Sequence, residues 1–210
     1  MSRLKPLCAD TRSSGPSCCT DCVFWQHRSR ALDPDLKRRW AATTEVTFGP
    51  WGCILDEDGV FRGLIQYGPA PVFGRARTLP AGPPSRDAAL ITCAYVRGDD
   101  LSGTCERLLL EALADLKARG AVAAEAFALG FPDDVAADVR SREHHTLFDR
   151  DQLERLGFQP VRSAGQVTLM RLPLGGLEPS ALPSLAARLS RPLRNLQVSF
   201  PAPATLRADA

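Results

Sequence analysis

The stretch that decides the fold is Ala88–Leu129, AALITCAYVRGDDLSGTCERLLLEALADLKARGAVAAEAFAL. It begins with an apolar, partly alternating run, passes through a polar turn and continues with an apolar stripe at helical spacing. After Arg119-Gly120 it returns to a second apolar run. We therefore predict a strand, a helix from about Gly103 to Arg119, and a second strand. Because the first amides of a helix have no partner within it, the turn before the helix is a candidate phosphate site.

Length and composition are those of an ordinary globular protein. The 210 residues fit one domain with extensions, and 44% hydrophobic with 24% charged residues is typical of soluble chains. A formal charge of +2 gives no general attraction to nucleic acid or to a membrane surface. We find no secretory signal and no apolar run long enough to span a bilayer, so we expect a cytoplasmic protein. Its seven cysteines are then expected to be reduced.

The segments before this stretch predict a helix and a hairpin. Asp33–Thr44 opens with an Asp-Pro start signal and continues as a helix. Trp51–Leu55 and Val60–Tyr67 are β-rich runs joined by a short turn that contains glycine. Gly68–Arg86 is rich in Pro, Gly and Arg and predicts an irregular segment, either a binding lid or a mobile excursion.

The segments after it close the domain. Phe148–Leu156 predicts a helix, and Phe158–Val161 with Val167–Leu172 predicts a final pair of strands. Beyond them the composition shifts to Pro, Ala, Ser, Leu and Arg, which indicates an arm that lies on the domain or on a partner. The predicted division is a Cys-containing N-terminal extension over residues 1–21, a domain over residues 22–175 and a C-terminal arm over residues 176–210.

The polar segment Met1–Gly15 is expected to be loosely attached, and a Cys-rich segment follows it. The thiol and imidazole groups in this region belong to Cys8, Cys18, Cys19, Cys22 and His27. Two cysteines with two residues between them have the spacing of a zinc half-site. Because a distant second pair is missing, we favour reduced cysteines that pack as small apolar groups, with zinc as the less favoured alternative. A redox pair is a third reading, but Val23–Trp25 predicts a short strand where that chemistry needs a helix N-terminus.

A group of basic residues lies near the start of the first helix: Arg28, Arg30, Lys37, Arg38 and Arg39. No interleaved aromatic residues and no nucleic-acid-binding motif accompany them. We therefore interpret the group as the solvated face of a helix rather than as a nucleic-acid surface.

The predicted order of elements is strand, helix, hairpin, strand–helix–strand, helix and two final strands. With YVRGDDLSGTCERLLLEALADLKARG and DQLERLGFQPVR in those places, residues 22–174 resemble the GNAT superfamily of acetyl-CoA-dependent N-acetyltransferases. CVFW, GLIQYGP, LITCAYVR and EAF further resemble an actinobacterial-type subgroup of mostly unassigned substrate. The resemblance implies an α/β (α+β) fold with a mixed central sheet flanked by helices, and acetyl-CoA as a substrate.

In that family, the strand before the helix pairs with the pantetheine arm, and a glycine-containing loop holds the pyrophosphate of CoA. For this chain the resemblance implies the following CoA-binding residues: Ala94, Tyr95, Val96, Leu101, Ser102, Gly103, Thr104, Cys105 and Glu106. The loop departs from the family pattern, because Gly103 lies one residue out of register and Thr104 and Glu106 stand at the glycine positions. A carboxylate there suits the helix dipole but would repel a diphosphate. Leu153 stands where many members carry a tyrosine that protonates the thiolate of CoA.

The candidate catalytic residues are Glu125, Tyr95 and Tyr67. The resemblance implies a general base in the strand that holds Glu125, provided that its side chain faces the cleft; the alternative is an outward polar residue. Either tyrosine could replace the missing acid, and both also fit a role in the core. His144 and His145 are further proton carriers, although adjacent loop histidines are more often solvated. Cys93 has no identifiable histidine partner, which argues against a thiol that carries the acyl group.

The leading hypothesis is an N-acetyltransferase that moves an acetyl group directly from acetyl-CoA to a primary amine of a small molecule or a protein. The alternative is a catalytically inactive module of the same fold that binds a ligand or a protein partner, or that pairs as a homodimer. Zinc-dependent nucleic-acid binding through residues 8–40 ranks last.

Overall fold

The computed structural model describes residues 2–29, 31–132, 134–135, 140 and 142–175. The strands are β1 (Ser2–Pro6), β2 (Gly52–Glu57), β3 (Val60–Pro69), β4 (Ala89–Val96), β5 (Ala123–Leu129), β6 (His144–His145), β7 (Phe148–Asp149), β8 (Gln159–Ala164) and β9 (Val167–Pro173). The α-helices in this part of the chain are α1 (Ser17–Thr20), α2 (Pro34–Phe48), α3 (Leu101–Ala118) and α5 (Arg150–Arg155). Short 3₁₀ turns lie at Arg12–Ser14, Ala70–Val72 and Gly74–Arg77.

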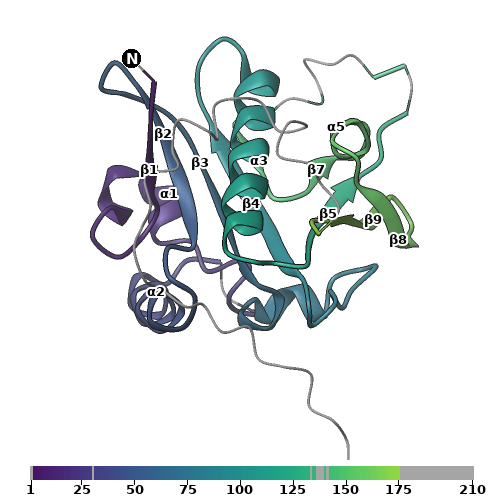
Figure 1. Cartoon of the computed structure of the whole chain (residues 1–210), viewed down its shortest axis with the longest axis horizontal. Coiled ribbons are helices and arrows are strands. Elements are labelled where there is room, and N and C mark those ends of the chain that lie inside the picture. Colours follow the sequence, from purple (N-terminus) through teal and green to yellow (C-terminus); the bar gives the residue numbers. More distant parts are fainter. Residues whose placement is uncertain (1, 30, 133, 136–139, 141, 176–210) are drawn as a thin grey trace, which may run out of the picture.

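The described strands form one mixed sheet with helices on both faces (Figure 1). The strand order is β1-β2-β3-β4-β5-β9-β8, while β6 pairs with β4 and β7 pairs with β5. The β4–β5 and β5–β7 pairs are parallel, and the other pairs are antiparallel. The mixed sheet that the sequence predicts is therefore confirmed.

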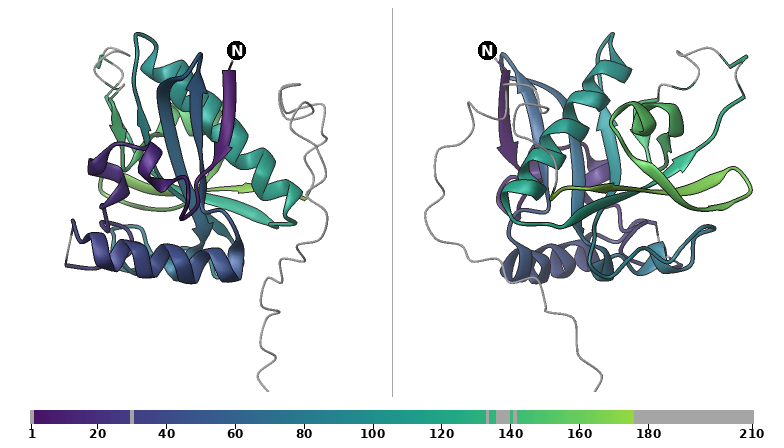
Figure 2. Two further views of the ribbon diagram at one scale, coloured as in Figure 1. Left: turned by 90° about the vertical axis from the view of Figure 1, so that its left-hand side faces the viewer. Right: turned by 45° about the vertical axis from the view of Figure 1, so that its right-hand side comes forward.

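Helices lie on both faces of this sheet and across one of its ends. Helix α3 covers one face, where its leucines pack against β2, β3 and β4. The segment that holds α1 lies on the opposite face, and α2 crosses one end of the sheet (Figure 2). Its position across the end explains why α2 gives Phe48 to the core on the α3 side and Ala41 to the core on the other side.

Local sequence signals account for α2 and for the first hairpin. The side chain of Asp33 accepts a hydrogen bond from the Leu36 amide at 2.9 Å and so caps α2. The turn between β2 and β3 has positive φ values at Asp58 (51°) and Gly59 (81°), which matches a type I′ turn. Both elements confirm the predictions from sequence.

Strands β4 and β5 separate after a short run of pairing, and this fork is the main irregularity of the sheet. Their register ends at Ile91 opposite Ala126. In the same place Thr92 is an extra residue in β4, because Gln66 of β3 lies opposite Cys93 while the next residue of β3 lies opposite Ile91. A bulge of this kind bends a strand and increases its twist. We attribute the fork to this bulge.

Several expectations about the remaining segments are wrong. The N-terminus is not loosely attached, because Ser2–Pro6 pairs with β2 along its whole length. Val23–Trp25 does not form a strand; only the neighbouring residue Cys22 makes an isolated bridge, to Leu32. Phe148 begins β7 rather than a helix, and α5 starts two residues later. The final pair of strands, β8 and β9, is confirmed.

The segment Gly68–Arg86 packs onto the domain. Phe73, Ala76 and Ala81 are buried, and the guanidinium of Arg162 donates to the carbonyl oxygens of Ala81 and Pro83. The predicted C-terminal arm over residues 176–210 lies outside the described residues. Within the described part, no helix has the length and apolar character needed to cross a membrane.

Candidate functional site

Beyond the fork, the edge of β4 pairs with the short strand β6 of the same chain. Ala94 lies opposite His145 and Tyr95 opposite His144, and the Val96 amide donates to the carbonyl of Glu143 at 2.7 Å. These are the three β4 positions that the sequence assigns to CoA. A ligand that pairs with this edge must therefore displace β6.

Helix α3 begins two residues earlier than predicted, so Leu101–Glu106 is its first part rather than a loop before it. Asp100 caps the helix and accepts a hydrogen bond from the Gly103 amide at 2.8 Å. A Cβ at position 103 would meet Oδ2 of Asp100 at 2.1 Å, so any other residue there would require the Asp100 side chain to shift. Cys105 is buried in the core beneath α3, and burial raises the pKa of its thiol to about 12.

A polar pocket lies beside the N-terminus of α3. Its lining includes Ser102 of α3, His145 of β6, and Gln152 and Arg155 of α5. The Gln152 side-chain amide donates to the Ser102 carbonyl at 3.1 Å, which fixes α5 against the start of α3. Sequence reasoning assigned no role to the two α5 residues, because only the fold brings that helix to this helix end.

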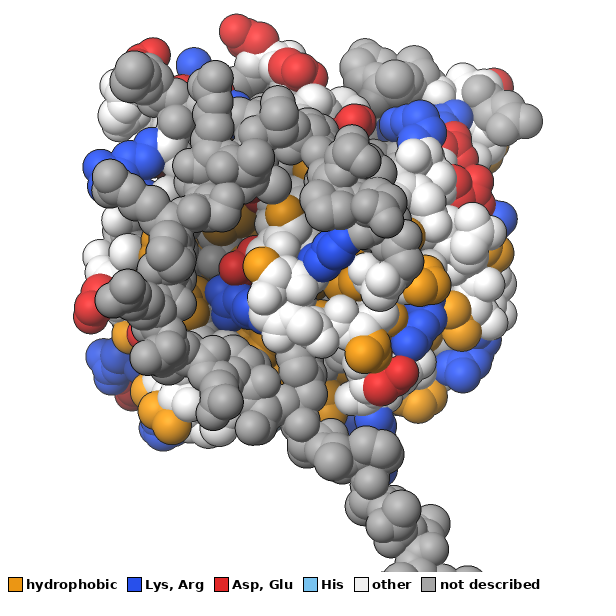
Figure 3. All heavy atoms as spheres, in the orientation of Figure 1, with side chains coloured by type: hydrophobic (Ala, Val, Ile, Leu, Met, Phe, Trp, Pro, Cys, Tyr) orange, Lys and Arg blue, Asp and Glu red, His pale blue; other side chains and the backbone are white. Residues whose placement is uncertain are grey.

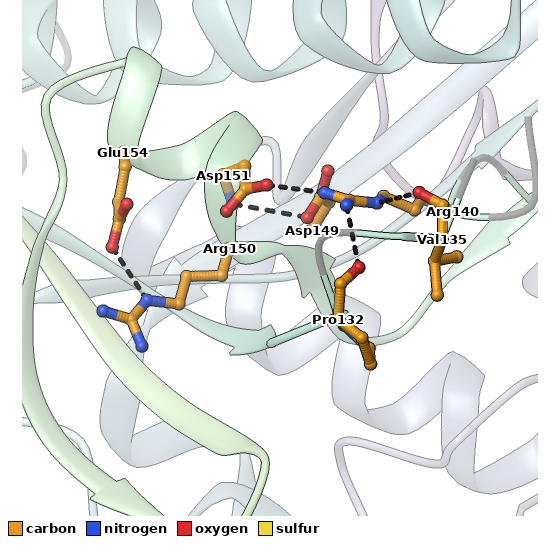
Figure 4. A network of polar contacts seen from close by, with 7 residues as sticks. All are labelled: Pro132, Val135, Arg140, Asp149, Arg150, Asp151 and Glu154. Atoms are coloured by element: carbon orange, nitrogen blue, oxygen red, sulfur yellow. Dashed lines mark hydrogen bonds and ion pairs between the residues drawn. The ribbon is translucent and has the colours of Figure 1, made fainter. Parts of the chain in front are cut away.

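Arg140 also lines the pocket, and its guanidinium is held in place by several contacts (Figure 4). It donates to the carbonyl oxygens of Val135 (2.9 Å) and Pro132 (3.0 Å) and pairs with the Asp151 carboxylate at 2.5 Å. Asp149 lines the pocket as well, and partial burial raises the pKa of its carboxyl group. The pocket thus holds both signs of charge, with arginine side chains from two segments.

The two histidines are not solvated, contrary to expectation. His145 is 5% exposed, burial lowers its pKa to about 4, and its Nε2 has no hydrogen-bond partner among the described residues. Partial burial also lowers the pKa of His144, whose ring lies edge-on to Tyr95 with 5.9 Å between ring centroids. Both imidazoles are therefore neutral at pH 7.

The two tyrosines lie on opposite faces of the sheet. The Tyr67 hydroxyl donates to Asp115 of α3 at 2.7 Å, and burial together with that carboxylate raises its pKa well above its ordinary value. Tyr95 lies at the fork, where its hydroxyl accepts from Arg97 Nε at 3.0 Å and contacts the Glu143 carboxylate at 3.3 Å. Of the two candidate acids, Tyr95 is the one on β4 itself, in the part of the strand that pairs with β6.

Glu125 is fully buried, and both of its oxygens are occupied. Arg171 donates to Oε1 and the Ser85 amide to Oε2, each at 2.8 Å. Because the side chain is 0% exposed and each oxygen already accepts a hydrogen bond, Glu125 fits a structural role that holds residue 85 and β9 to β5. Its conditional assignment as a base that faces the cleft does not match this geometry.

The described residues form no disulfide and offer no metal site, and the charges on the face in Figure 3 are dispersed. All seven cysteines are free thiols, and Cys18 and Cys19 approach to 3.9 Å between sulfur atoms. Among the described residues, no group of three or more His, Cys, Asp or Glu side chains is placed to hold a metal ion. On the visible face of Figure 3, basic side chains lie in small separate groups, several of them beside acidic ones.

No family model and no curated protein matches the sequence. An N-acetyltransferase from Staphylococcus aureus Mu50 superposes with a TM-score of 0.50 at 13% identity, over 83% of this chain and 99% of its own. The protein yncA from Salmonella typhimurium, solved with its cofactor acetyl-CoA, superposes with a TM-score of 0.52 at 16% identity, over 84% and 95%. The chain has the GNAT fold.

The GNAT fold of this chain contains two local features at its candidate site. The β4 edge is covered by β6, and the N-terminus of α3 is capped by Asp100. Both features lie next to the polar pocket, since β6 contributes His145 to the pocket and α3 contributes Ser102.

Proposed function

We propose that this protein is an N-acetyltransferase that moves an acetyl group directly from acetyl-CoA to a primary amine. The observation that carries the proposal is the position of the strand fork next to the polar pocket at the N-terminus of α3. Helix-end amides and arginine side chains are the groups that bind a diphosphate. In the pocket these would be Ser102 of α3 and Arg155 of α5, and the Gly103 amide would join them only if it left the Asp100 carboxylate.

The chemistry that this arrangement supports is direct attack of the neutral amine on the thioester carbonyl. The new C–N bond forms as the C–S bond breaks, and the amine loses a proton while the thiolate gains one. Amides on the β4 edge at Ala94–Val96 would stabilise the oxyanion that develops on the carbonyl oxygen. Tyr95 is the candidate acid for the thiolate, because its hydroxyl adjoins this edge and is held by Arg97.

Glu143–His145 must leave the β4 edge before a thioester can reach those amides. This requirement makes hydrogen exchange the sharpest test of the proposal. In the free protein the Val96 amide is protected by its bond to Glu143. With saturating acetyl-CoA we expect the amides of residues 143–146 to exchange faster while those of β4 remain protected by the ligand.

Calorimetry supplies the second arm of this test. We expect saturable heat with acetyl-CoA, and release of CoA when a panel of primary amines is added. No heat and no thermal stabilisation at millimolar acetyl-CoA would reject the proposal. Binding with faster exchange but no turnover would mean only that the panel lacks the acceptor, so the binding and exchange results decide.

The second candidate is a catalytically inactive module of the same fold that binds a ligand or a protein partner. It is favoured by the pairing of β6 with β4 and by the carboxylate that caps α3. If the ligand or partner of such a module is not a CoA derivative, neither acetyl-CoA nor CoA changes exchange at residues 94–96 or 143–146. Saturable acetyl-CoA binding with loss of protection in β6 contradicts it.

A further inference from the structure

A small cavity lies on the face of the sheet opposite α3, between the Cys-rich segment and the start of α2. The lining residues whose side chains have N–H or O–H donors are Arg12, Thr20, Trp25, Gln26, Lys37, Trp51, Gln66 and His144. None of the described residues that line it is Asp or Glu. Most of the surface that faces the cavity is apolar, and no anionic side chain among the described lining residues balances Arg12 and Lys37.

Lys37 is the centre of this donor set. It is 1% exposed, and its Nζ donates to Gln66 Oε1 at 2.6 Å. The rings of Trp40 and Trp51 flank the ammonium at 4.7 and 5.0 Å. No carboxylate in the described part of the chain pairs with it. The sequence placed Lys37 on a solvated helix face, and the structure shows this to be wrong.

The nearby thiols do not supply the missing negative charge. Burial lowers the pKa of Lys37 to about 8, so the side chain is mostly an ammonium at pH 7. Burial raises the pKa of Cys93 to about 12 and that of Cys19 above its ordinary range, so these thiols are neutral. A buried ammonium without a counter-charge is costly, because it loses its hydration and gains little in return.

Three further donors around the cavity lack acceptors. Nε1 of Trp25, Nε1 of Trp51 and Nε2 of Gln26 are buried and have no hydrogen-bond partner among the described residues. A buried donor without an acceptor is costly because it has lost its hydrogen bonds to water, so three at one cavity need a common explanation. A ligand that brings negative charge and several acceptor lone pairs would satisfy both these donors and Lys37.

The size of the space selects the ligand group. The cavity has room for about one water-sized group, which admits one oxygen atom of a terminal group while the rest of that group lies at the partly buried side. A carboxylate is the smallest organic group that offers one negative charge and two acceptor oxygens. Arg12, Gln26 and His144 are only partly buried, so they mark the side from which the rest of the molecule extends.

We propose that this cavity binds the carboxylate of a small molecule, and that the acyl acceptor is an amino acid-like compound that carries both an amine and a carboxylate. The second half rests on the proposed transferase function. The position of the cavity supports such an acceptor, because Cys93 and His144 line the cavity and directly adjoin the β4–β6 pairing at the fork. A carboxylate fixed beside Lys37 would direct the amine of the same molecule toward that fork.

The test uses intrinsic tryptophan fluorescence, because Trp25 and Trp51 line the cavity and Trp40 contacts Lys37. Without acetyl-CoA, the full-length protein is titrated with sodium acetate, glycine and methylamine hydrochloride at a fixed ionic strength set with sodium chloride. We expect saturable changes with acetate and glycine and none with methylamine. An identical response to chloride alone, or no saturation with acetate and glycine, overturns the proposal without any variant.

Two lysine variants then locate the site. Lys37→Met removes the charge at similar volume, and we expect acetate affinity to fall at least about tenfold. Lys117→Met removes the same charge from α3 on the opposite face and should leave the affinity unchanged. Lys37→Gln keeps a donor and repeats the measurement if the first variant fails to fold. Unchanged affinity in a folded Lys37 variant contradicts the proposal.

The pH dependence gives an independent readout. Arg12, Cys19, Cys22 and Cys93 are the other charged or titratable groups that act on Lys37. Because anion binding needs the ammonium, acetate affinity should fall by about tenfold or more between about pH 7 and 9.5 as Lys37 loses its proton. Carboxylate binding without acetyl-CoA binding would reject the transferase and keep the cavity; the reverse result would reject the cavity alone.

Discussion

At the scale of single residues, Glu125 shows how the surroundings of a carboxylate fix its role. Glu125 is the fully buried partner in its ion pair with Arg171. The Asp87 carboxylate, which also pairs with Arg171, is 60% exposed. We predict that Glu125→Gln lowers the free energy of unfolding by about 1.5–3 kcal/mol, because it removes a charged hydrogen bond from the interior. Urea denaturation measures this loss.

Asp87→Asn is the matched control at the same arginine. Since the Asp87 pair is exposed to solvent, its removal should cost less than about 1 kcal/mol. Any acetyl-CoA-dependent turnover should stay within about threefold in Glu125→Gln. A loss of about 100-fold or more would instead indicate that Glu125 is a general base, contrary to its assignment here.

Residue roles of this kind were the least predictable from sequence. Glu125 carries no local signal that Arg171 and the Ser85 amide occupy it, because these partners lie 46 and 40 residues away. Lys37 sits among basic residues in the sequence, yet helical spacing places it on the same side of α2 as Ala41, Thr44 and Phe48. That spacing was the available signal, and the basic neighbours masked it.

At the scale of elements, the caps of α2 and α3 form a matched pair. Asp33 and Asp100 each accept one first-turn amide, at 2.9 and 2.8 Å. We predict that Asp33→Ala and Asp100→Ala each cost about 0.5–2 kcal/mol of stability, measured by thermal denaturation. Only the α3 cap competes with a phosphate for the helix end. Asp100→Ala should therefore raise acetyl-CoA affinity by about 2- to 5-fold, while Asp33→Ala leaves it unchanged.

An equal effect of the two variants on acetyl-CoA affinity would contradict this account of the pocket. The cap also explains why the structure has no loop at the place where the sequence predicted a phosphate-binding loop. The expected loop Leu101–Glu106 is already helical because Asp100 starts α3, and the glycine at 103 accommodates that carboxylate.

The pairing of β6 with β4 is the second feature at this scale whose effect on acetyl-CoA affinity can be tested. Glycine costs a strand about 0.5–1 kcal/mol per residue, so Glu143→Gly with Thr146→Gly on either side of β6 should weaken its pairing with β4 by about 1–2 kcal/mol. If acetyl-CoA displaces β6, its affinity should rise by about 5- to 30-fold, measured by calorimetry. The double variant Val161→Gly with Ser163→Gly in β8 is the control and should have no such effect. Equal affinity in parent and β6 variant would show that β6 is not displaced.

At the scale of the whole molecule, periodic segments were predictable and the sheet's irregular parts were not. The hairpin, β4, α3 and the last two strands follow from apolar spacing and turn residues, and the structure confirms them. The fork depends on one extra residue at Thr92, and β6 is only two residues long. Neither leaves a periodic pattern. β1 was missed because SRLKP is polar, as an edge strand with one solvated side can be.

The edge position of β1 leads to a last prediction. Its five residues pair with β2, and Lys5 forms an ion pair with Asp56. Removal of residues 1–6 would expose the unpaired backbone of β2, whose first four residues are buried. We predict that Tm falls by at least about 5 °C and that the truncated chain self-associates through this edge, measured by thermal denaturation and size-exclusion chromatography. Leu4→Ala keeps the strand and should lower Tm less, without association. A truncated chain with the parent's Tm and elution volume would show that β1 is dispensable.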